Sequence, residues 1–147
     1  FGKQHGEISH RTQTSSVLGE LRVLVVDDNT TARLILSSML ESFGLRVEQA
    51  NDGTTAITLL ENAANDPYDL VLMDWKMPGL DGVETTRVIQ NDENISKTPM
   101  VIMVTAYGRE EAGAAAEDVD IRGFLTKPVT PSHLLDTIMQ AKGKEVI

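Results

Sequence analysis

Polar side chains follow four apolar segments of this sequence, at the points where those segments end. Asp27 and Asp28 follow RVLVV, Asp74 follows LVLM, Thr105 follows MVIMV, and Lys127 comes shortly after GFL. Carboxylates bind hard divalent cations and can attack phosphorus as nucleophiles. An ammonium and a hydroxyl can hold phosphoryl oxygens. If the fold brings these residues together, the chemistry they support is phosphoryl transfer to a carboxylate.

The elements that must position these residues follow from hydrophobic periodicity. Strands are predicted at residues 22–26, 46–50, 70–73, 100–104 and 121–125. Helices are predicted at about 32–43, 54–64, 83–91 and 109–117, and from about 131 onward. This alternation predicts an α/β fold of the flavodoxin-like, doubly wound type. In such a fold five strands form one parallel sheet in the order 2-1-3-4-5, and five helices cover its two faces.

The carboxyl ends of parallel strands lie at one edge of a sheet, so the polar residues are expected to meet in one crevice. Three carboxylates repel one another there, which raises the proton affinity of at least one unless a cation joins them. Mg²⁺ is the simplest such cation because it takes few protein carboxylates and keeps room for phosphate oxygens; Mn²⁺ is possible in its place. The residues therefore predict a Mg²⁺-dependent phosphoacceptor site centred on Asp74.

Each of these residues has an ordinary structural explanation when it is considered alone. Asp27 and Asp28 are residues that commonly cap a helix, and Asp74 precedes a Pro-Gly turn in which aspartate is frequent. Trp75 could lie at the entrance of the crevice or pack beneath a loop. The convergence of four strand ends favours the chemical interpretation for the acids.

Composition excludes several classes of function for this segment. The chain has 13 basic and 22 acidic residues among 147, a net charge of −9, which opposes direct binding to nucleic acid or to anionic membranes. It has no cysteine, which excludes disulfides and thiolate chemistry. No apolar segment approaches the roughly 18–20 residues of a membrane helix, and no signal peptide is recognisable. A cytoplasmic location is expected, with a parent protein that can be membrane-anchored.

Residues 21 to about 141 resemble the receiver domain of two-component signalling. VLVVDDN, LVLMDWKMPGLDG, VTA and FLTKP match that family in content, order and spacing. The resemblance implies that Asp74 takes a phosphoryl group from a phosphohistidine, carried by a histidine kinase domain or a histidine phosphotransfer protein. It also implies that Asp28 binds Mg²⁺ with help from Asp27 and Asp74, and that the backbone carbonyl of Lys76 completes the protein ligands.

The same resemblance assigns roles to the residues around Asp74. Thr105 and Lys127 would contact the phosphoryl group, and the peptide bond between Lys127 and Pro128 would be cis. Thr105 and Phe124 would form a two-state switch, whose output surface consists of the fourth predicted helix, the fifth strand and the last helix. Tyr107, close to Thr105, is expected with Lys76 to tune the lifetime of the phosphate.

The predicted domain organisation has three parts. Residues 1–20 are a polar linker or the tail of a preceding kinase ATP-binding domain, because FGKQHG resembles such a tail. Residues 21–142 form the receiver domain, and residues 143–147 form a C-terminal tail. Since the chain begins at Phe1 rather than at methionine, we expect a piece of a longer protein, and a hybrid histidine kinase is favoured.

Two other functions are compatible with such a fold. Aspartyl-phosphate, Mg²⁺-dependent phosphohydrolases of the haloacid-dehalogenase type carry a DxD motif, whereas Asp27 and Asp28 are adjacent and Asn29 follows them. A flavodoxin-like nucleotide binder would place phosphate in the first loop, where the two acids repel it in the absence of a metal. A signalling domain with at most slow self-dephosphorylation, rather than an enzyme, is therefore the favoured interpretation.

Overall fold

The computed structural model describes residues 21–106 and 108–146, so the predictions for residues 1–20 and for Tyr107 lie outside the described residues. Five strands and five helices alternate along the part of the chain that is described. They are β1 (Arg22–Val26), α2 (Thr30–Ser42), β2 (Arg46–Ala50), α3 (Gly53–Glu61), β3 (Leu70–Asp74), α4 (Gly82–Asn91), β4 (Met100–Thr105), α5 (Arg109–Ala115), β5 (Gly123–Thr126) and α6 (Pro131–Val146).

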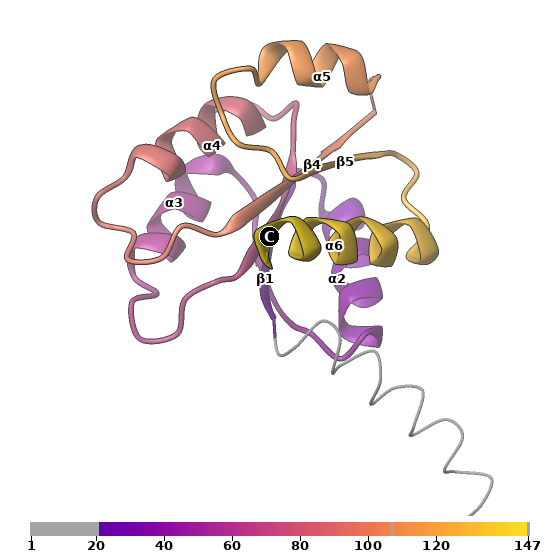
Figure 1. Ribbon diagram of the computed structural model, residues 1–147, viewed down its shortest axis with the longest axis horizontal. Helices are drawn as coiled ribbons and strands as arrows, with labels where there is room; N and C mark the ends of the chain where they lie inside the picture. Colours follow the sequence, from indigo (N-terminus) through magenta and orange to yellow (C-terminus); the bar gives the residue numbers. More distant parts are fainter. Residues whose placement is uncertain (1–20, 107, 147) are drawn as a thin grey trace, which may run out of the picture.

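The strands form one sheet in the order β2-β1-β3-β4-β5, and each neighbouring pair is parallel. This order confirms the predicted doubly wound architecture. Figure 1 shows α2 and α6 together on one side of the sheet, with α3 and α4 on the other. The buried residues of α5 join the same cluster as those of α3 and α4, so three helices cover that second face.

The three central strands consist almost wholly of buried apolar residues. Every residue of β3 and β4 is buried, and all of β1 is buried except Arg22, which is half-buried. A strand in the middle of a parallel sheet has helices over both faces, so both of its sets of side chains must be apolar. Alternate residues enter two hydrophobic clusters, one beneath α2 and α6 and one beneath α3, α4 and α5.

The end of α2 shows how the sequence turns the chain back toward β2. Gly44 has a φ of 86°. Its N–H donates to the carbonyl of Glu41, and the N–H of Leu45 donates to the carbonyl of Leu40, which together form a Schellman motif. Glycine adopts this left-handed conformation without a steric penalty. The predicted ending of the first helix before Gly44 is confirmed.

Several element boundaries differ from the predictions. β3 and β4 each continue one residue further, so Asp74 and Thr105 are the last residues of their strands. The prediction that α3 extends to residue 64 was wrong, because the N–H of Ala63 bonds to the carbonyl of Leu60, a tighter turn that closes the helix. β5 begins at Gly123 rather than at residue 121. Just before it, the backbone of Asp120 bonds to the side chain of Gln90.

The C-terminal helix continues to Val146, so the proposed domain end at residue 142 falls within α6. None of the described helices combines the length with the apolar composition that crossing a bilayer requires.

Candidate functional site

The predicted site residues lie together at the carboxyl edge of the sheet. Asp27 follows the last residue of β1, Asp74 and Thr105 end β3 and β4, and Lys127 follows β5. The strand register places Val26 beside Met73 and Asp74 beside Val104, which brings these ends level with one another. Together they line a crevice of about 300 Å³, whose full lining is Asp27, Asp28, Asn29, Asp74, Lys76, Thr105, Ala106 and Lys127.

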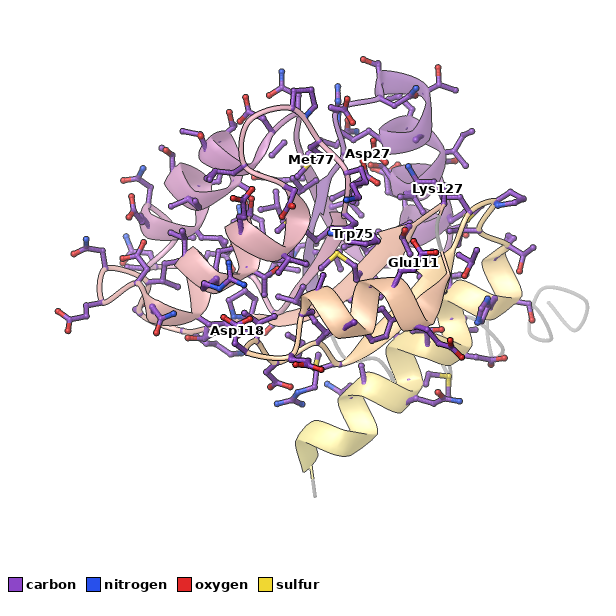
Figure 2. All side chains as sticks on the ribbon, turned by 90° about the horizontal axis from the view of Figure 1, so that it is seen from above. Asp27, Trp75, Met77, Glu111, Asp118 and Lys127 are labelled. Carbon is purple, nitrogen blue, oxygen red and sulfur yellow. The ribbon has the colours of Figure 1, made fainter. Side chains whose placement is uncertain are left out.

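Lys127 joins two of the carboxylates. Its Nζ lies 3.1 Å from Oδ2 of Asp27 and 3.2 Å from Oδ1 of Asp74. Asp27 and Lys127 point toward each other in Figure 2. Asp27 is fully buried and Asp74 is 6% exposed, so each depends on this partner for its charge to be tolerated.

The capping explanation for the acidic pair was wrong. Asn29 is the N-cap of α2, and its side chain accepts a hydrogen bond from the N–H of Ala32. Asp27 instead uses Oδ1 to accept the N–H of Asn29 at 2.9 Å. Asn29, which also lines the crevice, was not among the predicted site residues, although its place after the acidic pair and before an apolar helix is typical of an N-cap.

The three acids fit a divalent cation. One carboxylate oxygen from each of Asp27, Asp28 and Asp74 can be chosen so that all three lie within 4.8 Å of one another. Asp28 is exposed, whereas the other two are buried at the floor of the crevice. A set of oxygen donors open to solvent on one side suits Mg²⁺, which binds through one or two carboxylates and retains water.

The electrostatics of the crevice are dominated by negative charge. Burial, together with repulsion from Asp27, raises the pKa of Asp74 to about 6, although the nearby Lys127 ammonium opposes the shift. Burial alone would lower the pKa of Lys127, but attraction to Asp74 and Asp27 outweighs it and raises that pKa. An additional cation would therefore favour the ionised form of Asp74.

Trp75 and Lys76 follow Asp74 in the chain and contact each other. Trp75 is 6% exposed and belongs to the core cluster beneath α3, α4 and α5, so it packs in the interior rather than at the crevice entrance. Lys76 is exposed, and its Nζ lies 4.1 Å from the centroid of the Trp75 ring, a cation–π contact. The assignment of the Lys76 carbonyl as a metal ligand stays a prediction.

The loop after Asp74 returns tightly to α4. The N–H of Gly82 donates to the carbonyl of Trp75 at 2.6 Å. A Cβ at residue 82 would lie 2.3 Å from the carbonyl oxygen of Asp74, so only glycine permits this approach. Asp81 and Glu84 then form a reciprocal capping box that starts α4. The loop that follows the phosphoacceptor candidate is thus held at both its start and its end.

The proposed switch residues lie on one face of the sheet. Side chains alternate along a strand, so Thr105 shares the face of Met103, whose register partner is Phe124. Phe124 is half-buried against the cluster that includes Ala112 of α5. Thr105 is 1% exposed. Both residues therefore lie on the sheet face that α5 covers, while their roles in switching stay predictions.

The peptide bond between Lys127 and Pro128 is cis, the isomer that the resemblance implied.

Comparison with known proteins places this architecture in a family. The family model named "Response regulator receiver domain" matches residues 23–139 of the sequence. The chain is 33% identical over 119 residues to the chemotaxis protein CheY of Pseudomonas aeruginosa strain PAO1, covering 80% of this chain and 93% of that protein. It is 32% identical over 119 residues to CheY-3 of Vibrio cholerae, covering 80% and 88%.

Solved structures agree. The chemotaxis protein CheY4 of Vibrio cholerae has a TM-score of 0.74 and 28% identity, covering 84% of this chain and 99% of that one. The receiver domain of the sensor histidine kinase PA1611 from Pseudomonas aeruginosa PAO1 has a TM-score of 0.73 and 29% identity, covering 85% and 99%. That structure has a magnesium ion coordinated in its active site cleft.

A doubly wound domain with acids and a lysine converging at the carboxyl edge of its sheet defines a class of phosphoacceptor signalling modules. The family match extends over most of the described residues. The chain belongs to the response regulator receiver domain family, and its function is phosphoacceptor signalling. The alternative of a phosphohydrolase is not favoured.

Proposed function

We propose that Asp74 accepts a phosphoryl group from a phosphohistidine in a Mg²⁺-dependent reaction, and that the domain then changes conformation to pass the signal on. The observation that carries this proposal is the position of Asp74. Its carboxylate is buried in the crevice, 3.2 Å from the Lys127 ammonium. One of its oxygens lies within 4.8 Å of a carboxylate oxygen of Asp27 and of Asp28. Phosphoryl transfer to Asp74 uses all three features: the buried carboxylate, the ammonium and the additional acids.

The transfer needs Asp74 as a carboxylate. One of its oxygens forms the new bond to phosphorus, the phosphorus–nitrogen bond of the phosphohistidine breaks, and the electron pair of that bond stays on the imidazole nitrogen. Lys127 favours the ionised form of Asp74 before transfer and would then hold a phosphoryl oxygen. Thr105, which ends the adjacent strand and lines the crevice, would donate its hydroxyl to the same group.

Asp28, Asp27 and Asp74, with the Lys76 carbonyl, are the groups proposed to hold Mg²⁺, or Mn²⁺ in its place. The ion would supply neutralisation of the charge that builds up on the transferring phosphoryl group. Because Asp28 is the exposed member of the set, it is the carboxylate best placed to receive an ion from solvent.

The phosphohistidine partner, a histidine kinase domain or a histidine phosphotransfer protein, is proposed to dock beside α2. Leu34 and Ile35 on this helix are 54% and 51% exposed, unusual for large apolar side chains. An apolar groove of about 380 Å³ runs from Ile35 to Pro128 and Val129. Lys127 lines both this groove and the crevice, so an apolar helix face in the groove would lie next to Asp74.

Substitution in this groove separates partner docking from chemistry. Ile35→Asp is expected to slow phosphotransfer from a phosphohistidine protein by about 10-fold or more, because a charge would be desolvated in an apolar contact. Labelling by a small phosphodonor should be unchanged. Met139→Asp on α6, a position that is 40% exposed and does not line the groove, is the matched control. Equal rates for Ile35→Asp and wild type with the protein donor would contradict this docking site.

The signal is proposed to leave through the α5–β5–α6 surface, in a switch that involves Thr105 and Phe124. Support comes from their common location on the face covered by α5. α5 has seven residues, and its N-cap Gly108 supplies no side-chain hydrogen bond. Ala112 is buried, as is the C-cap residue Ala116. Such a small contact area makes α5 the helix most easily displaced.

The wider context is also a proposal. We favour a receiver module of a hybrid histidine kinase, with residues 21–142 as the receiver, a preceding linker or kinase tail at 1–20 and a tail at 143–147. The similarity to the receiver domain of a sensor histidine kinase supports this view. A cytoplasmic position and a non-enzymatic role, with at most slow self-dephosphorylation, complete the proposal.

Phosphate incorporation tests the central assignment. Incubation with Mg²⁺ and a small phosphodonor is expected to add one phosphate to the intact protein, detected by mass. Asp74→Asn should abolish this labelling because an amide is not a competent nucleophile. Asp69→Asn, a matched change at the opposite edge of the sheet, should retain it. Full labelling of Asp74→Asn would refute Asp74 as the acceptor.

A further inference from the structure

Every polar group of Asp27, in its backbone and in its side chain, makes a hydrogen bond. Its N–H donates to the carbonyl of Ala50 at 3.2 Å, and its two carboxylate oxygens accept from the N–H of Asn29 and from Lys127. Its carbonyl oxygen accepts from Nη1 of Arg33 at 2.8 Å. The last of these bonds comes from a side chain that does not line the crevice.

Arg33 connects three elements through one guanidinium. It lies on the first part of α2, where its own N–H donates to the carbonyl of Asn29. While Nη1 reaches Asp27, Nε donates to Oε1 of Gln49 on β2 at 3.1 Å. The planar fork of an arginine can satisfy two such acceptors at once, whereas a lysine ammonium lacks this fixed geometry.

The carbonyl that Arg33 holds belongs to the peptide that joins Asp27 to Asp28. A peptide unit is planar, so its oxygen, its N–H and the Cα of Asp28 move as one body. Fixing the oxygen therefore fixes the direction in which Asp28 leaves the strand. Asp28 is exposed and lies between the end of β1 at Val26 and the start of α2 at Thr30. Because no strand or helix holds Asp28, this peptide is a principal constraint on its orientation.

We propose that Arg33 is a positioning residue for the metal site: it clamps the Asp27–Asp28 peptide, and through it sets the Asp28 carboxylate in the orientation that binds Mg²⁺. This inference rests on the proposed function. Both hydrogen bonds of the guanidinium go to neutral oxygens, of a peptide and of a side-chain amide. The role of Arg33 is accordingly orientation rather than charge neutralisation.

Calorimetric titration with MgCl₂ tests this role without any phosphodonor. Arg33→Met and Arg33→Lys are both expected to weaken Mg²⁺ binding by roughly 10- to 100-fold, the usual loss when a group that orients a metal ligand is removed. The loss should persist at high ionic strength, where exposed charge–charge effects are screened. Arg46→Met removes an arginine that bonds to Asp66 at the other edge of the sheet, and should bind Mg²⁺ like wild type.

The outcomes separate the inference from the function beneath it. If Arg33→Lys binds like wild type and Arg33→Met is weaker only at low salt, the effect is charge alone and the positioning role is overturned; unchanged affinity in both variants overturns it as well. Gln49→Leu, which leaves Arg33 in place but removes its second acceptor, should give a smaller loss and serves if the Arg33 variants do not fold. If wild type and Asp28→Asn both fail to bind Mg²⁺, the metal site of the proposed function itself is refuted.

Discussion

The two edges of the sheet differ in how completely their charged side chains are paired. At the amino edge, charged side chains are arranged in opposite pairs among the described residues: Arg22 with Glu48 and Asp66, Arg46 with Asp66, and Lys97 with Asp69. At the carboxyl edge, three carboxylates line a crevice with two lysines, and Lys76 directs its ammonium to the Trp75 ring. The charges of the first set cancel, whereas the three carboxylates that line the crevice outnumber its two lysines.

The amino edge is organised around Tyr68. The ring of Tyr68 packs under the Arg22 guanidinium, 4.1 Å from the ring centroid, and its hydroxyl donates to Oε2 of Glu48 at 2.5 Å. Burial, aided by Glu48, raises the pKa of Tyr68 to about 12, while the hydrogen bond from Tyr68 lowers the pKa of Glu48. Each charge is compensated within the protein, so this edge needs no ligand.

The carboxyl edge is compensated only in part. Lys127 serves both Asp27 and Asp74, yet the pKa of Asp74 stays raised, at about 6. The same fold thus completes its charge pairs at one end of the strands and leaves a deficit of positive charge in the crevice at the other. A divalent cation can fill that deficit, and a bound cation can in turn attract an anionic phosphoryl group.

The largest expected difference between the edges is in the rate at which Asp74 is labelled by a small phosphodonor. Lys127→Met should slow labelling by a small phosphodonor by about 100-fold or more, because a cation aimed at the transferring group is lost. Lys97→Met, which removes the lysine paired with Asp69 at the amino edge, should label at the rate of wild type. Phosphate incorporation followed over time by mass measures both. Similar slowing in the two variants would mean that the loss reflects folding and not the site.

Stability should respond with opposite signs at the two edges. Without divalent cations at pH 7.5, Asp74→Asn is expected to raise the free energy of unfolding by about 1–2 kcal/mol, since it removes a repelled carboxylate whose cost is partly screened by solvent. Asp69→Asn should lower it by about 1 kcal/mol, because Asp69 accepts from Lys97 and from the N–H of Arg22. Urea unfolding measures both.

The pH dependence of the Asp74→Asn difference follows from the sign of the shift. The folded-state pKa of about 6 lies above the ordinary value of 3.8, so the folded protein binds the extra proton first. The cost of Asp74 is therefore full above pH 6 and disappears as the pH falls toward 4, and the gain from Asp74→Asn should vanish with it. A gain that is constant between pH 4 and pH 7.5 would contradict the electrostatic explanation.

Tyr68→Phe is expected to have a small effect that is confined to the amino edge. This change removes the hydroxyl that donates to Glu48 but leaves the ring beneath Arg22, and should cost about 1 kcal/mol of unfolding free energy. Labelling at Asp74 should be unaffected, because the two edges lie at opposite ends of the strands. Altered labelling without a change in stability would show that the edges are coupled.

The sequence by itself determined the fold and which charged residues meet in the crevice. Apolar strands alternate with amphipathic helices, and a parallel sheet with helices on both sides buries both faces of such strands. Val71 of β3 and Ile102 of β4 are fully buried in this way. The carboxyl ends of such a sheet meet at one edge, so the convergence of Asp27, Asp74 and Lys127 follows from their positions after the strands. Local signals also sufficed for Gly44, whose left-handed turn ends α2.

Only the tertiary structure decided how these residues divide their tasks. Asp27 and Asp28 are adjacent and identical in type, yet one is fully buried against Lys127 and the other is exposed. The contact of Arg33 with the Asp27 carbonyl and the burial of Trp75 likewise depend on how α2 and the α3–α4–α5 layer pack on the sheet. Spacing along the chain specifies which side chains reach an edge, whereas burial and hydrogen-bond partners depend on neighbours that are distant in sequence.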